Sequence, residues 1–278
     1  MKPAHRPDPP ISFALTGAHP AQRPHPAIAL NAALRHALAG QQFELFYQPI
    51  VDHRRRMSGV EALIRWMHPQ RGLLGPNEFI PHAEKSDLIV EIGNWVLLTA
   101  CRQLAQWQHD AAARTHTISV NVSARQIRRP DFVAGVLDTL ARTGADPALL
   151  KLELTESVLV GNVDGIIDKV EALRAHGIGF ALDDFGTGYS SLGYLARLPV
   201  TQIKIDRSFV KNMLGTPRAA TIVQALIALA DALDVDVIAE GVETQAQWEA
   251  LIGFGARHFQ GYLFAAPMPL NELAASMA

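Results

Sequence analysis

Acidic, amide and lysine side chains stand at the ends of successive β-prone segments of this sequence. The set comprises Glu61, Asn121, Glu153, Asp183 with Asp184, Lys204 with Asp206, Glu240, and Gln260. Several carboxylates meeting in one cavity would repel one another and raise one another's pKa values unless cations were present. Carboxylate and amide oxygens, without a His or Cys cluster, are hard ligands that suit Mg²⁺ or Mn²⁺ better than Zn²⁺. The pattern therefore predicts a divalent-cation site.

The acids outnumber the ligands that one octahedral ion needs, and the adjacent pair Asp183 and Asp184 could bridge two ions. Two bound ions stabilise in-line displacement at phosphorus, so hydrolysis of a phosphodiester is the favoured chemistry. Taken singly, each residue has a structural alternative: the aspartates could cap a helix, and Lys204 could form a salt bridge with Asp206. Their recurrence at successive strand ends is what favours a site.

The segments that must position these residues alternate between strand-like and helix-like patterns. Strand-like runs cover residues 43–51, 58–66, 117–124, 150–157, 179–186, 201–208, 236–243 and 258–264, and helix-like stretches cover 131–143, 163–176, 218–233 and 244–254. Strand followed by helix, repeated in this way, predicts parallel β/α units, and eight strands favour closure into a barrel. An open doubly wound sheet is the alternative, although no glycine-rich phosphate loop supports its dinucleotide-binding form.

One junction departs from this pattern. Residues 52–57 are too few to hold the crossover helix that two neighbouring parallel strands require, so the first two strands are expected to pair antiparallel. The predicted fold class is α/β, a TIM-like (β/α)8 barrel with an antiparallel strand at its start. In such a barrel, side chains at the C-terminal ends of the strands converge on one face.

Composition narrows the class of partner. The chain has 278 residues, 49% of them apolar, and a net charge of -2, so nothing predicts binding to long nucleic acid. The single cysteine, Cys101, excludes a disulfide framework and favours a reducing compartment. With no apolar run typical of a membrane helix or signal peptide, the expected location is cytoplasmic. Residues 1–28 are expected to form a flexible leader or linker, and residues 29–278 the domain.

The chain resembles the EAL family of cyclic di-GMP phosphodiesterases. The tripeptide Glu61-Ala62-Leu63 stands within EALIRW, and the likeness runs from about Leu30 to Leu270. It includes, in order, YQPIV, NVSARQ, LELTES, DDFGTGYSSL, LPVTQIKIDRSFV, AEGVET and QGYLF. The resemblance implies two cations: Glu61, Asn121, Glu153 and Asp183 would bind one, and Asp183, Asp184 and Glu240 the other. Lys204, Glu240 and Glu61 would act at the reaction centre, with Lys204 beside the attacking water and Glu240 as the candidate general base.

The resemblance also implies the substrate, cyclic di-GMP, opened to linear pGpG. Arg65 is similar to the family's phosphate contact, Gln48 and Pro49 would border a guanine pocket lined by Leu63, and Asp206 and Gln260 would complete the substrate site. The segment from Asp184 to Leu192 resembles a flexible loop beside the cations and the dimer contact, which Glu156 would steady. A homodimer and an upstream GGDEF or sensory domain, not in this chain, are further expectations from the family.

Two other functions share parts of this pattern. A receptor module would keep the fold and bind cyclic di-GMP without cutting it, although such family members usually lack cation ligands or the loop motif that are present here. An enolase-like lyase would use carboxylates, Mg²⁺ and a lysine, but it needs a substantial capping domain before the barrel. Only one predicted helix, from Ala27 to Ala39, precedes the first strand.

Overall fold

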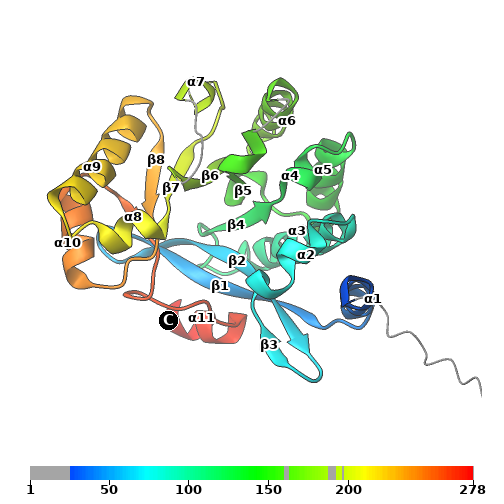
Figure 1. The fold of residues 1–278 in the computed structure, drawn as a ribbon. Coiled ribbons are helices and arrows are strands. Elements are labelled where there is room, and N and C mark those ends of the chain that lie inside the picture. The colour runs from blue at the N-terminus through cyan, green and yellow to red at the C-terminus, as the bar shows by residue number, and fades with distance from the viewer. Residues whose placement is uncertain (1–25, 160–162, 187–191, 196, 278) are drawn as a thin grey trace, which may run out of the picture.

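The computed structural model describes residues 26–159, 163–186, 192–195 and 197–277. The predicted leader, residues 1–28, lies outside the described part except for its last three residues, which begin α1 (Pro26–Ala39). The described chain forms one closed barrel with helices around it (Figure 1).

Eight strands close the barrel, which confirms the predicted fold class. Their bounds are β1 (Phe43–Asp52), β2 (Met57–His68), β4 (Thr117–Val122), β5 (Leu150–Thr155), β6 (Gly179–Phe185), β7 (Gln202–Ile205), β8 (Asp236–Ala239) and β9 (His258–Phe259). They pair in the order β1-β9-β8-β7-β6-β5-β4-β2, and β1 pairs with β2 to complete the ring. β1 runs antiparallel to both of its neighbours, β2 and β9, and the other pairs in the ring are parallel. The antiparallel start expected from the short connection at residues 52–57 is therefore confirmed.

Helices cover the outside of the strands (Figure 1). They are α2 (Ile80–Ala83), α3 (Leu88–Trp107), α4 (Ala124–Ile127), α5 (Phe132–Thr143), α6 (Asp164–Arg174), α7 (Leu192–Leu195), α8 (Arg207–Asn212), α9 (Pro217–Ala232), α10 (Gln245–Gly253) and α11 (Leu270–Met277). Short 3₁₀ turns lie at η1 (Pro76–Glu78), η2 (Pro147–Leu149) and η3 (Glu156–Leu159). The helices predicted from periodicity, α5, α6, α9 and α10, begin and end within two residues of the predicted bounds. Thr216 and Thr244 explain two of these starts, because each side chain accepts a hydrogen bond from the first turn of its helix.

The core follows from strands such as β5 and β6, in which alternate residues are apolar and buried, so that one face of each of these strands is apolar. Leu150, Leu152 and Leu154 on β5 are fully buried, and so are Phe180 and Leu182 on β6. The polar residues of these two strands are Lys151, Glu153 and Thr155 on β5 and Asp183 and Asp184 on β6, and all but Lys151 lie in the carboxyl-terminal half of their strand. Polar side chains of these strands are therefore concentrated toward one end of the barrel.

α3 differs from the expectation that no segment is apolar enough to cross a membrane. By length and composition this 20-residue helix qualifies, but half of the qualifying window is buried inside the protein. Its buried face includes Leu88, Ile92, Val96 and Leu104, which belong to the hydrophobic core. The apolar composition of α3 is explained by its position as a core helix of the barrel.

A short strand, β3 (Gly72–Leu74), was not predicted from the sequence. It pairs antiparallel with the end of β2 and extends that hairpin beyond the barrel (Figure 1). Three residues are too few to show a recognisable alternation of apolar and polar side chains.

Candidate cation and phosphate site

Lys204, on β7, lies among four carboxylates at the C-terminal end of the barrel strands. Its ammonium nitrogen Nζ is 2.6 Å from Glu153 Oε2 and 2.6 Å from Glu240 Oε1. The same nitrogen lies 3.3 Å from Glu61 Oε2 and 3.3 Å from Asp183 Oδ1. The lysine side chain is 1% exposed, so these ion pairs are shielded from water. Residues far apart in the sequence therefore meet at one point, as the barrel requires.

Burial and crowding perturb the ionisation of this cluster. Burial alone would lower the pKa of Lys204, but attraction by Glu153 and Glu240 raises it well above the ordinary value, so the ammonium stays charged. Burial raises the pKa of Glu153 to about 8, since attraction by Lys204 only partly offsets it and Glu61 adds repulsion. Burial likewise raises the pKa of Glu240 well above its ordinary value. One ammonium does not neutralise four acids, and the cluster can accept further positive charge.

Amide side chains from two other strands hold Glu61. Asn121 Nδ2, from β4, donates to Glu61 Oε1 at 2.7 Å, and Gln260 Nε2, just after β9, donates to Glu61 Oε2 at 2.7 Å. The Gln260 amide nitrogen also donates to Gln48 Oε1 at 3.0 Å. Burial alone would raise the pKa of Glu61, but Lys204 and the two amide hydrogen bonds hold it below its ordinary value. Glu61 is therefore ionised and fixed in position.

A bulge in β6 brings the carboxylates of two adjacent aspartates close together. Successive side chains of a regular strand point to opposite faces. Here the register between β6 and β7 shifts, so that Asp183 and Asp184 stand opposite Lys204 alone. Asp184 has φ 54°, a left-handed conformation that aspartate tolerates better than most residues, and its N–H donates to Asp183 Oδ1 at 3.0 Å.

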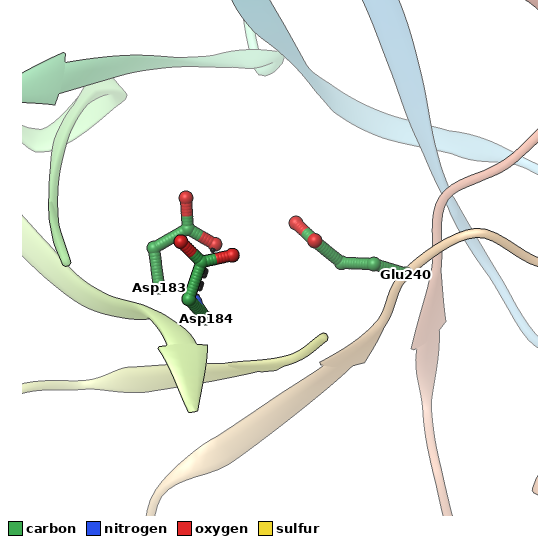
Figure 2. A group of neighbouring side chains, drawn as sticks. All are labelled: Asp183, Asp184 and Glu240. Carbon is green, nitrogen blue, oxygen red and sulfur yellow. Dashed lines mark hydrogen bonds between the residues drawn. The ribbon is translucent and has the colours of Figure 1, made fainter. Parts of the chain in front are cut away.

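The two aspartates face Glu240, which directly follows β8. Figure 2 shows their carboxylates on one side of a gap and that of Glu240 on the other, pointing toward one another. One carboxylate oxygen from each residue lies within 4.8 Å of the others. Burial, with repulsion from Asp183, raises the pKa of Asp184. Three oxygens at this spacing form a group that can hold a divalent cation.

The donor set fits hard divalent cations. The side chains that converge here offer carboxylate oxygens and an amide, which are the ligands of Mg²⁺ and Mn²⁺. Glu153 Oε1 is buried and accepts no hydrogen bond from the described residues, although its other oxygen is paired with Lys204. A buried carboxylate oxygen without a donor is costly in an apo protein and is available to a cation.

A cavity of about 220 Å³ opens beside this cluster. Of the residues predicted to bind substrate, Gln48, Leu63 and Gln260 line it. Arg65 is two residues beyond Leu63 on β2 and therefore on the same strand face, with its guanidinium carbon 5.4 Å from the centre of the Phe46 ring.

Arg65 and the other two predicted substrate residues, Pro49 and Asp206, are not among the cavity-lining residues of the described chain. Pro49 is buried, pairs with Val60 on β2, and lies on the strand face opposite to that of Gln48. Asp206 is the N-cap of α8, where its Oδ1 accepts a hydrogen bond from the Ser208 N–H at 3.0 Å. The structure gives both residues a local structural role.

Three residues that were not predicted from the sequence also line the cavity: Arg207, Glu243 and Tyr262. Each comes from a loop or a helix start that follows a strand, rather than from the strand itself. Tyr262 is 70% exposed, an unusual position for an aromatic side chain. The signal that could have found them is their place, within three residues of Lys204, Glu240 or Gln260.

The predicted loop from Asp184 to Leu192 falls largely outside the described residues, because 187–191 are not described. Glu156, expected to steady that loop, begins η3 and is 7% exposed. Its assignment stays a prediction.

Fold and site together define a (β/α)8 barrel with a carboxylate-rich cavity suited to divalent cations. The family model for the EAL domain matches residues 31–267. The bifunctional diguanylate cyclase/cyclic di-GMP phosphodiesterase MucR of Pseudomonas aeruginosa is 46% identical over 246 residues, which cover 88% of this chain and 36% of MucR. The cyclic di-GMP phosphodiesterase NbdA of the same organism is 42% identical over 247 residues, covering 88% of this chain and 31% of NbdA.

Comparison with solved structures points to the same family as the sequence relatives do. The MucR phosphodiesterase in complex with c-di-GMP superposes with a TM-score of 0.84 at 46% identity, covering 88% of this chain and 99% of that one. The FimX EAL domain of Pseudomonas aeruginosa bound to c-di-GMP gives a TM-score of 0.78 at 26% identity, covering 88% and 97%. The chain belongs to the EAL domain family. It spans about a third of the length of the curated relatives described above.

Proposed function

We propose that this chain is a cyclic di-GMP-specific phosphodiesterase that hydrolyses one phosphodiester of its substrate to give linear pGpG. The observation that carries the proposal is the cluster of Glu61, Glu153, Asp183 and Glu240 around Lys204, beside a cavity that can admit a phosphate. The names of MucR and NbdA, both cyclic di-GMP phosphodiesterases, support the same substrate for this chain.

Two cations, Mg²⁺ or Mn²⁺, are assigned to this cluster. Glu61, Asn121, Glu153 and Asp183 would bind the first, while Asp183, shared, would bind the second with Asp184 and Glu240. The spacing of the last three oxygens, within 4.8 Å, supports the second site. Bound divalent cations would supply a water of lowered pKa and would neutralise the charge that develops on the phosphate.

The chain's own residues would orient the reactants. Lys204, held charged by its acidic neighbours, would place a positive charge next to the phosphate and the attacking water. Glu240, whose pKa is raised by burial, is a stronger base than an ordinary glutamate and is the candidate general base. Gln260 would keep Glu61 in position, since it donates a hydrogen bond to the Glu61 carboxylate.

Substrate contacts are assigned to the face of β1 and β2 that continues from Glu61. Gln48 and Leu63 line the cavity and would border a guanine, and Arg65 would offer its planar guanidinium to a phosphate. Gln48 is itself fixed, because its Nε2 donates to the Ala265 carbonyl at 3.1 Å. A pre-positioned amide loses little entropy when it meets a base.

The decisive experiment is turnover of cyclic di-GMP by the purified protein with Mg²⁺, Mn²⁺, Ca²⁺ or a chelator, with products identified by mass. We expect pGpG with Mg²⁺ or Mn²⁺ and no product with the chelator. A receptor module would instead bind the ligand and yield no pGpG under any of these conditions, and that outcome would overturn the proposal.

Two variants test the assigned ligands. Glu61→Ala and Asp183→Ala are each expected to abolish hydrolysis while the barrel stays folded, because three carboxylates remain to pair with Lys204. Glu171→Ala, which removes an exposed carboxylate on α6, is the matched control and is expected to keep wild-type turnover. Near-wild-type activity of either ligand variant would refute the cation assignment.

We further propose that the protein acts in the cytoplasm as a homodimer and functions with a GGDEF or sensory domain. The name of MucR, a bifunctional cyclase and phosphodiesterase, supports the last point. Analytical ultracentrifugation with and without cyclic di-GMP tests the dimer, and a single monomeric species at micromolar concentration would contradict it.

A further inference from the structure

Arg207 is the second positively charged residue in the wall of the site cavity. It is the first residue of α8, three positions after Lys204, and it is exposed to solvent. The described lining residues include four acids, Glu61, Asp183, Glu240 and Glu243, and two cations, Lys204 and Arg207. The two cations differ in what they already bind.

Lys204 is committed to the protein, because its ammonium contacts four carboxylates within 3.3 Å. Within the described part of the chain, Arg207 makes no ion pair, no hydrogen bond through its side chain and no contact with an aromatic ring. No described carboxylate pairs with Arg207, although Glu240 and Glu243 line the same cavity. Its five N–H donors are therefore available to a ligand.

The backbone around Arg207 is shaped to its position. Gly241, directly after Glu240, has φ 62°, and a Cβ built on it would lie 3.2 Å from Arg207 Cα and closer still to Arg207 Cβ. Only a glycine allows the loop after β8 to pass this close to the start of α8. Arg207 is thereby held next to Glu240, on the wall of the cavity.

We propose that Arg207 binds the phosphodiester of the substrate that is not being cut. This inference rests on the proposed function. A cyclic dinucleotide carries two phosphodiesters, and when one lies at the carboxylate cluster the other enters a cavity whose remaining charges are mostly negative. A guanidinium fork that no carboxylate occupies matches the two unesterified oxygens of that group. Arg207 thus makes the cavity selective for a ligand with two phosphates.

The first test measures binding, without turnover. The dissociation constant for cyclic di-GMP is measured by titration calorimetry with Ca²⁺ for wild type, Arg207→Ala and Arg207→Lys. Loss of a charge-assisted hydrogen bond is expected to weaken binding by about tenfold or more in Arg207→Ala, with a smaller loss in Arg207→Lys. Arg218→Ala, which removes an exposed arginine at the start of α9, is the matched control and is expected to bind as wild type does.

The second test asks whether the effect depends on the second phosphate. Bis(p-nitrophenyl) phosphate, with one phosphodiester, serves as the comparison substrate, and the readout is the ratio of kcat/KM for cyclic di-GMP to kcat/KM for this compound. The ratio is expected to fall about tenfold in Arg207→Ala, with the loss appearing in KM for cyclic di-GMP. Melting temperatures of the variants check that folding is unchanged.

The outcomes separate this inference from the proposed function. If wild type binds cyclic di-GMP but forms no pGpG, the proposed activity fails while the dissociation constants still test Arg207. If Arg207→Ala binds cyclic di-GMP within twofold of wild type, the inference is wrong whatever the turnover. An equal loss toward both substrates would also overturn it, because Arg207 would then act at the scissile phosphate.

Discussion

Replacing Lys204 by methionine tests the electrostatic account of the site most directly. The methionine keeps the volume of an unbranched side chain and removes the ammonium that four carboxylates share. Since the lysine side chain is 1% exposed, water cannot take over its role. We expect the metal-free variant to fold less stably, because Glu153 and its neighbours would lose their common counter-ion.

The expected loss can be estimated. Removing one partner from a buried ion pair costs about 3–5 kcal/mol. For a domain of this size, each kcal/mol shifts the melting temperature by about 2–4 °C, so in chelator the variant should melt about 6–20 °C below wild type. Without the ammonium, burial and mutual repulsion raise the pKa values of the carboxylates in the folded variant, so the folded state is more stable when they are protonated. The deficit should therefore be smaller at pH 5 and should grow as the pH rises to 8.

The assay is thermal unfolding in chelator and in millimolar Mn²⁺, at pH 5 and pH 8. Bound cations replace the missing charge, so Mn²⁺ should raise the melting temperature of Lys204→Met more than that of wild type. Lys211→Met, which removes an exposed lysine from α8, is the control and should change little. A deficit below 1 °C in chelator at pH 8, or an equal effect of Mn²⁺ on both proteins, would refute the reasoning.

Three further predictions follow from the described contacts. Burial raises the pKa of Glu153 to about 8, and a ligand must lose its proton to bind a cation, so affinity for Mn²⁺ should rise by up to about tenfold per pH unit between pH 6 and pH 8. An affinity constant from calorimetry that stays the same over this range would contradict this. Cys101 is fully buried, and burial raises the pKa of its thiol to about 12. A thiol reagent at pH 8 should therefore label Cys101 only after denaturation, and rapid labelling of the native protein would contradict this. Gly93→Ala should lower the free energy of unfolding, measured in urea, by about 1–3 kcal/mol, because a Cβ at this position would lie 1.9 Å from Nε2 of Gln126. Gly135→Ala, whose Cβ would meet no atom within 4 Å, is the control, and equal stabilities of the two variants would disprove the overlap.

The barrel could be predicted because its strands are long enough, or repeated often enough, to show their pattern. β1 and β2 follow the predicted bounds within two residues at either end. The later strands are shorter than predicted: β7 ends at Ile205 because Asp206 caps α8, and β9 ends at Phe259, shortly before Gly261 turns the chain. A run of β-prone residues shows where a strand lies, while its end depends on capping contacts that the pattern does not contain.

The site was predictable in part for the same reason. Glu61, Glu153 and Lys204 project from regular strands, and the barrel topology alone brings them together. Strand periodicity alone does not explain how Asp184 joins Asp183 in the site, because this depends on a bulge and a left-handed backbone angle in β6; the family resemblance is what assigned Asp184 to a cation. Arg207 reaches the cavity from a helix start, so its place depends on how closely the loops after β7 and β8 approach.

The closure of the barrel has a consequence for its dynamics. β9 joins β1 through only two residue pairs and β8 through two more, whereas β1 and β2 pair along nearly their whole length. Directly beyond this narrow seam, the Gln260 amide bridges Gln48 and Glu61. Backbone amides of β9 should therefore exchange with deuterium early, and a ligand that holds Glu61 should slow that exchange, because occupying the site also fastens the two ends of the ring together.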